Sequence, residues 1–165
     1  MDAALYKDFV TSRGYSYHFY RVPASDGKPT LLFLHGFPST SYDWHKQVAY
    51  FKQLGYGLIV PDMLGYAGTS KPAEPEAYRA SLLTKDIIEI LDAEGLDKVV
   101  AIGHDWYVMR VLCHSEHAVA DNWVGDRSSL LVWLTTTPSA SSRLASWPLG
   151  TSHPPRTETL SSTTS

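Results

Sequence analysis

The stretch that decides the fold is Lys98-Val99-Val100-Ala101-Ile102, which runs directly into Gly103-His104-Asp105-Trp106. Residues 98–102 form a short apolar run, typical of a strand that is buried on both faces of a sheet. Gly103 supplies a small residue two positions before Asp105, as close packing around a strained turn demands. The sequence therefore predicts a buried strand with an acidic residue, Asp105, on a tight turn at its tip.

Upstream of this turn, two more apolar runs alternate with two amphipathic segments. The runs at 30–34 and 56–60 are predicted to be buried strands, and helices are expected at about 41–54 and 78–94. A glycine follows each predicted helix, as is common at helix ends. Strand, helix, strand, helix, strand is the order of an α/β fold, so we predict a mostly parallel sheet with right-handed crossovers.

Composition places the chain among ordinary globular proteins and excludes several functions. Its 165 residues fit one domain, and 44% hydrophobic residues are enough for a core. A formal net charge of −3 leaves no basic footprint, so nucleic acid is not expected as a partner. No apolar run approaches the roughly 20 residues of a membrane span, and the N-terminus has no signal pattern. The single cysteine, Cys113, fits a reducing compartment. We therefore expect a soluble, cytoplasmic protein with no membrane partner.

The chain divides into two parts of different character. Residues 1–106 have the orderly α/β pattern, whereas residues 107–165 lack it, and Ser, Thr and Pro dominate from about residue 135. Such a composition buries too little apolar surface to offset chain entropy. The apolar residues at 130–134 show no sustained helical or strand period. We therefore predict an irregular or disordered tail, which would leave strand 99–102 as an exposed apolar edge and favour self-association through it.

Two loops upstream of Asp105 also follow buried strands. His35-Gly36-Phe37-Pro38 comes after the first strand, and Gly36 lets the backbone approach another group closely. Asp62-Met63-Leu64-Gly65-Tyr66-Ala67-Gly68-Thr69-Ser70 follows the second strand. This second loop lacks the Lys-Ser pair of a phosphate-binding loop, and we interpret it as a structural turn. The first loop alone would also fit a plain turn, but together with the Asp105 turn it indicates a functional site.

In this order, the motifs at residues 35–38, 62–70 and 103–106 resemble the epoxide hydrolases of the α/β-hydrolase superfamily. The resemblance covers about residues 5–106 and implies an incomplete α/β-hydrolase core that ends at the nucleophile elbow. Phe37 favours the epoxide hydrolases over their sister family, the haloalkane dehalogenases. A dehalogenase-like protein, or another α/β hydrolase, stays open as an alternative.

The resemblance implies a role for each matching residue. Asp105 would be the nucleophile, which opens the ring of a small epoxide and forms an alkyl ester that hydrolysis turns into a diol. The backbone amides of Phe37 and Trp106 would form the oxyanion hole. The groups that support this site would come from His35, Gly36 and His104. Neither a metal nor a cofactor is implied.

The sequence departs from the family pattern at Tyr107. A small residue is expected two positions after the nucleophile, because the turn is strained and tightly packed. The family also has two lid tyrosines, a later acid and a C-terminal His that activates water, and residues 107–165 match none of them. We therefore predict a truncated protein that is inactive as an enzyme, since an ester at Asp105 would have no base to hydrolyse it.

A further alternative is a non-catalytic product of a retained intron or a shifted reading frame. Trp106-Tyr107-Val108 must be encoded as TGG-TAY-GTN, which contains GTAYGT, a string that resembles a fungal intron donor site. On this hypothesis, residues 107–165 are translated from sequence outside the ancestral reading frame.

Overall fold

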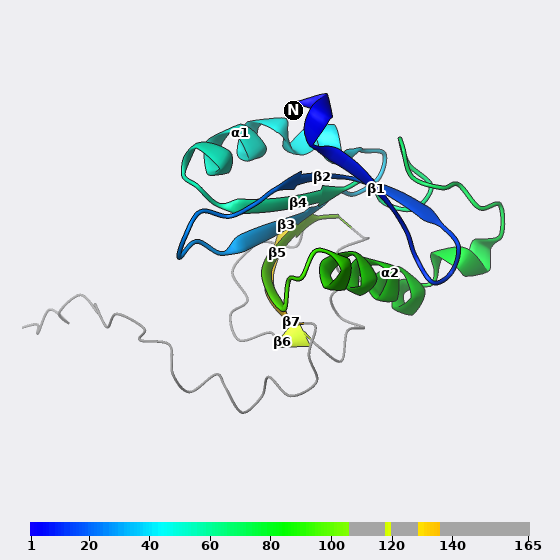
Figure 1. Cartoon of the computed structure of the whole chain (residues 1–165). Helices are drawn as coiled ribbons and strands as arrows, with labels where there is room; N and C mark the ends of the chain where they lie inside the picture. Colours follow the sequence, from blue (N-terminus) through cyan, green and yellow to red (C-terminus); the bar gives the residue numbers. More distant parts are fainter. Residues whose placement is uncertain (106–117, 120–128, 136–165) are drawn as a thin grey trace, which may run out of the picture.

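The computed structural model describes residues 1–105, 118–119 and 129–135. In chain order, the strands, α-helices and short 3-10 helices (η) are η1 (Ala3–Leu5), β1 (Tyr6–Val10), β2 (Ser16–Val22), β3 (Thr30–Leu34), η2 (Ser41–Trp44), α1 (His45–Gln53), β4 (Gly57–Pro61), η3 (Pro75–Tyr78), α2 (Ala80–Ala93), β5 (Lys98–His104), β6 (Ala118–Val119) and β7 (Ser129–Thr135). The strands make one sheet in the order β1-β2-β4-β3-β5-β7-β6 (Figure 1). This order places β4, β3 and β5 side by side at the centre of the sheet.

The three central strands are parallel, as the sequence predicts. Leu31 of β3 lies opposite Leu58 of β4 on one side and opposite Val100 of β5 on the other. The outer strands β1, β2, β7 and β6 run antiparallel to their inner neighbours, so the sheet as a whole is mixed. Parallel strands need long crossover connections, and α1 and α2 lie in the two connections between the central strands. The predicted α/β fold class is therefore confirmed, but the expectation of a mostly parallel sheet is corrected, because four of the six pairings among the described strands are antiparallel.

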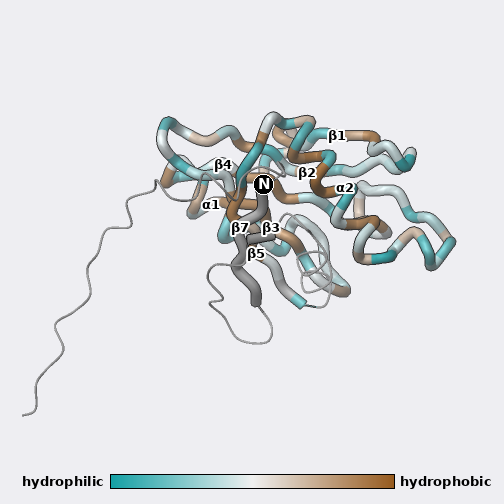
Figure 2. Tube along the Cα trace, turned by 90° about the horizontal axis from the view of Figure 1, so that it is seen from below, coloured by the Kyte–Doolittle hydropathy of each residue, from teal (hydrophilic) through white to brown (hydrophobic). Residues whose placement is uncertain are grey.

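The two α-helices cover opposite faces of the sheet (Figure 1). Alternate residues of β3 divide between two cores: Leu32 belongs to the cluster that contains Ile87 of α2, and Phe33 to the cluster that contains Val48 of α1. This division is what a strand buried on both faces produces. Figure 2 shows the hydrophobic segments gathered along the central strands.

The helix boundaries follow local signals. The predicted helix at 41–54 is two elements, η2 followed by α1, and the side chain of Thr40 caps the first by accepting a hydrogen bond of 3.3 Å from the N–H of Tyr42. Beyond α1 and α2, Gly55 and Gly95 have φ angles of 80° and 67°. These left-handed angles favour glycine and explain why both helices end there.

The prediction of an irregular tail is wrong for residues 129–135. They form β7, which pairs antiparallel with all of β5, from Lys98 opposite Thr135 to His104 opposite Ser129. A continuous apolar run needs no polar alternation when its strand lies inside a sheet, so the absence of a period did not exclude a strand. Strand 99–102 is therefore not an exposed edge, which removes the reason given for self-association through it. Most of the predicted tail, including the part after residue 135, lies outside the described residues.

In the part of the chain that the structure describes, no helix is long and apolar enough to cross a membrane. The 14-residue helix α2 falls short of the roughly 20 residues that a span needs.

Candidate active site

The loops that follow β3, β4 and β5 meet at one edge of the sheet. Because these strands are parallel, their carboxyl ends lie together, and ligand sites of open α/β sheets form at such an edge. His35 follows β3, Asp62 follows β4, and Asp105 follows β5. Three side chains with acid–base or hydrogen-bonding chemistry therefore enter the same region from three neighbouring strands.

Asp105 has a left-handed backbone conformation, with a φ of 68°. This conformation is uncommon for residues other than glycine, and it is often found where a fold holds a functional side chain on a strained turn. Oδ2 of the Asp105 carboxylate accepts a hydrogen bond of 3.0 Å from the backbone N–H of Phe37. The loop after β3 and the turn after β5 are thus in direct contact.

His35 is buried, with an exposed fraction of 1%, and fixes the start of the loop after β3. Its Nε2 accepts a hydrogen bond of 2.9 Å from the N–H of Met63, so the proton is on Nδ1, which donates to the carbonyl oxygen of Gly36 at 2.9 Å. Burial lowers the pKa of His35, although the bond to Gly36 and nearby carboxylates act in the opposite direction. His35 is therefore a neutral imidazole whose two nitrogens are both engaged, which suits support of the loop rather than proton transfer.

Asp62 is a second buried group at this edge, with an exposed fraction of 3%. Oδ1 accepts a hydrogen bond of 2.8 Å from the N–H of Ser41, and Oδ2 accepts one of 3.1 Å from the N–H of Gly68. The contact with Ser41 joins the loop after β4 to the far end of the loop after β3. Sequence reasoning missed this link, and its only signal was a polar residue directly after a buried strand.

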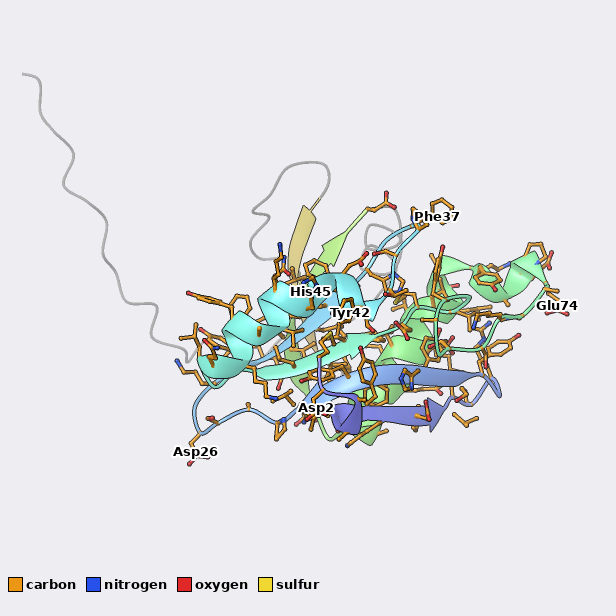
Figure 3. The ribbon with its side chains drawn as sticks, turned by 90° about the horizontal axis from the view of Figure 1, so that it is seen from above. Asp2, Asp26, Phe37, Tyr42, His45 and Glu74 are labelled. Atoms are coloured by element: carbon orange, nitrogen blue, oxygen red, sulfur yellow. The ribbon has the colours of Figure 1, made fainter. Side chains whose placement is uncertain are left out.

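A cavity of about 350 Å³ opens beside the loop after β3. Its wall contains His35, Gly36, Phe37, Pro38, Ser39, Asp43, Trp44 and Gln47. The ring of Phe37 is 71% exposed and projects outward from the end of this loop (Figure 3). The wall of this cavity therefore combines an apolar ring with polar groups of the same loop.

The remaining predicted site residues have different outcomes. Gly36 is buried between His35 and Phe37, His104 is the last residue of β5, and Trp106 and Tyr107 lie outside the described residues. Among residues 1–105, 118–119 and 129–135, no three His, Cys, Asp or Glu side chains are arranged to hold a metal ion. The groups that the structure brings to one edge are those of His35, Gly36, Phe37, Asp62 and Asp105.

Comparison with known sequences shows which proteins these loops resemble. Residues 29–106 match the family described as alpha/beta hydrolase fold. The chain is 44% identical over 78 residues to epoxide hydrolase 3 of Siraitia grosvenorii, an overlap of 47% of this chain and 25% of that protein. It is 37% identical over 98 residues to epoxide hydrolase A of Mycobacterium tuberculosis, an overlap of 57% of this chain and 30% of the relative. The chain thus spans between a quarter and a third of the length of these relatives.

Solved structures show the same similarity. Epoxide hydrolase A from Mycobacterium thermoresistibile matches with a TM-score of 0.59 and 32% identity, over 66% of this chain and 33% of that chain. An epoxide hydrolase from Vigna radiata matches with a TM-score of 0.59 and 29% identity, over 66% of this chain and 34% of the other. The matched residues therefore form part of an α/β-hydrolase fold. Within that superfamily they resemble the epoxide hydrolases, as the three sequence motifs predict.

Proposed function

We propose that Asp105 is a nucleophile that opens the ring of a small epoxide. One observation carries the proposal: the Asp105 carboxylate, on a left-handed turn at the end of β5, lies 3.0 Å from the amide nitrogen of Phe37. A nucleophile held in a fixed orientation reacts faster than a mobile one, because less freedom is lost on reaching the transition state. The similarity to proteins named epoxide hydrolases supports the epoxide as the substrate class.

The proposed step forms one bond and breaks another. A carboxylate oxygen of Asp105 attacks a ring carbon, the bond between that carbon and the ring oxygen breaks, and the ring oxygen takes a proton from water. The product is a 2-hydroxyalkyl ester of Asp105, and hydroxide returns to the solvent. The attacking group must be the ionised carboxylate, since a protonated acid is a weak nucleophile.

We also propose that the amide of Phe37 is one donor of an oxyanion hole. When water attacks the ester carbonyl of Asp105, negative charge develops on the oxygen that the Phe37 N–H would bind. The amide of Trp106 is proposed as the second donor by resemblance to the family. His35 and Gly36 would hold the Phe37 amide in place, and His104 would support the turn from the end of β5.

We propose further that the 165-residue polypeptide stops at the ester. In the family, hydrolysis depends on a lid, a later acid and a C-terminal His, and residues 107–165 do not match that pattern in sequence. On this view residues 1–106 supply the nucleophile half of a hydrolase domain, and residues 107–165 are unrelated to it. Without a general base, attack of water on the ester is slow, so the adduct should accumulate.

Intact-mass spectrometry after incubation with styrene oxide tests both proposals. We expect one equivalent of added epoxide, mapped to Asp105 by peptide analysis. Asp105→Asn should abolish the adduct, whereas Asp97→Asn, which removes an exposed carboxylate next to β5, should keep it. A label at another residue, or no label, would refute the nucleophile. Formation of diol beyond one equivalent would refute the arrest at the ester.

The two alternatives have their own tests. A primary haloalkane would give an Asp105 ester with release of halide, and faster labelling by the haloalkane than by the epoxide would favour a dehalogenase-like protein.

Sequencing the transcript across the codons of Trp106 and Tyr107 tests the non-catalytic product of a retained intron. A single transcript with an unbroken reading frame through Tyr107 would reject that hypothesis.

A further inference from the structure

We infer that Asp62 is a positioning residue, which fixes the backbone amide of Phe37 against the carboxylate of Asp105. The inference rests on the proposed function, because it gives a role to the contact between those two residues. It assigns a task to the loop at residues 62–70, which the sequence alone indicated to be only a turn. Two sets of contacts at the edge of the sheet, and the position of the groups that they join, support this role.

The first set shows that the loop after β3 is anchored at both ends by the loop after β4. At its start, Nε2 of His35 accepts a hydrogen bond of 2.9 Å from the N–H of Met63. At its end, the N–H of Ser41 donates to Oδ1 of Asp62 at 2.8 Å. Phe37 lies between these two anchors, so the direction of its amide depends on both.

The second set shows that the Asp62 carboxylate is itself immobile. Besides Ser41, it binds the N–H of Gly68 through Oδ2 at 3.1 Å. The Asp62 main chain is fixed as well, because its N–H donates to the carbonyl of His18 at 2.8 Å and its carbonyl accepts from the Thr69 hydroxyl at 2.7 Å. A buried carboxylate with both oxygens engaged by backbone donors is a rigid reference point for the chain segments around it.

The third observation concerns what the Asp62 carboxylate connects. The carboxylate accepts from the backbone N–H of Ser41, the first residue of η2, and from that of Gly68, in the same loop as Asp62. Both donors lie outside the strands. Neither Asp62 nor its two partners, Ser41 and Gly68, belongs to the hydrophobic clusters on the two faces of the sheet. Loss of the carboxylate should therefore displace the loop after β3 while the sheet keeps its packing.

Asp62→Asn is the direct test, because it keeps the shape but offers one acceptor oxygen to two N–H donors. The matched control is Asp92→Asn, which makes the same change at an exposed position of α2. The readout is the NMR signal of the Phe37 amide, whose chemical shift should change with pH as the Asp105 carboxylate titrates. Asp105→Asn should remove that titration and thereby assign it. We expect the size of the titration to fall at least twofold in Asp62→Asn and to stay unchanged in Asp92→Asn. Equal titration in Asp62→Asn and Asp92→Asn would overturn the inference.

A second pair of variants decides the question if Asp62→Asn fails to fold. Ser41→Pro removes both the backbone N–H that donates to Asp62 and the side-chain hydroxyl. Ser41→Ala removes the hydroxyl alone and keeps the N–H. Proline suits the first position of a helix, and the extended backbone of Thr40 is compatible with a following proline. The Phe37 titration should shrink at least twofold in Ser41→Pro and persist in Ser41→Ala. An identical titration in both variants would contradict the role of Asp62.

The mass-spectrometric test of Asp105 is independent of this one. If the wild-type chain forms no ester with styrene oxide, the proposed function fails, but the titration of the Phe37 amide still reports whether Asp62 sets its position. If the ester forms and the titration is insensitive to Asp62, the proposed function stands and the positioning role is rejected.

Discussion

The backbone N–H of Phe37 donates to the carboxylate of Asp105 at 3.0 Å, although 68 residues separate them in the chain. The contact is possible because β3 and β5 are adjacent and parallel, with Leu34 opposite Gly103 at their carboxyl ends. Every substitution of Phe37 except proline leaves this main-chain donor in place. The geometry of this contact is therefore set by the loop after β3 and by the backbone of Asp105 itself.

The left-handed backbone conformation of Asp105 should lower the stability of any variant that carries a Cβ atom at this position. Asp105→Ala and Asp105→Gly both remove the carboxylate and differ only in the Cβ atom. At a φ of 68°, we expect the Gly variant to be more stable towards urea than the Ala variant by about 1 kcal/mol. At Asp97, which has no positive φ, the order should be reversed, because glycine costs more backbone entropy. The same order at both positions would show that the Asp105 turn is not strained.

Part of this site could be predicted from sequence because its signals are local. The apolar runs before His35 and before Asp105 identify buried strands, and parallel strands bring the residues after them to one edge. The direct contact between Phe37 and Asp105 is of another kind, since it depends on the spatial order of strands. Only the resemblance to a known family suggested that these two residues act together.

The features that sequence reasoning missed depend on tertiary contacts. Asp62 bonds to the N–H of Ser41, and nothing in the residue types of either loop specifies that pair. β7 was missed because the apolar run at 130–134 lies beside a segment rich in Ser, Thr and Pro, and that composition was given more weight than the run itself, which is also typical of a buried strand. Its pairing with β5 is a non-local contact that becomes visible only in the folded sheet.

Close packing between β3 and β4 predicts a cost for a small enlargement at Gly57. A Cβ there would collide with Oγ1 of Thr30 and lie 3.1 Å from the backbone nitrogen of Ala24. We expect Gly57→Ala to lower the free energy of unfolding by about 1–3 kcal/mol. In the background of Thr30→Ala the loss should be smaller, because one of the two obstacles is gone, and a double-mutant cycle in urea measures the difference. Additive effects would indicate that Thr30 does not limit the space at Gly57.

Glu94 should make the stability of the sheet dependent on pH. Burial opposes its ionisation, but hydrogen bonds and charge from Lys7 and Arg21 outweigh this effect and hold its pKa below the ordinary value of 4.5. A carboxyl with a lowered pKa stabilises the folded state above about pH 4.5, and this contribution is lost as the pH falls through the folded pKa. Lys7 is half exposed, so the effect should be modest.

Glu94→Gln tests that expectation. Urea unfolding at pH 7 should give a loss of about 1 kcal/mol relative to wild type, and the difference should close as the pH falls below 4.5 and through the folded pKa of Glu94. Glu76→Gln, at an exposed position of η3, serves as the control and should change stability little at either pH. A loss at Glu94 of equal size at both pH values would mean that packing, and not charge, accounts for it.

The pairing of β7 with β5 predicts which backbone groups keep the sheet from associating. β7 covers β5 along its full length. The wild-type chain should therefore not associate with a second copy through the edge of β5. Successive N–H groups of a strand point to opposite sides, so Leu131→Pro and Val132→Pro differ in whether the donor to β5 is lost. The variant that loses this donor should expose β5 and self-associate, which light scattering after size-exclusion chromatography would detect. Val132→Thr keeps every backbone donor and should stay monomeric. If both proline variants remain monomeric and the β5 amides keep their protection against hydrogen exchange, β7 is not what covers this strand.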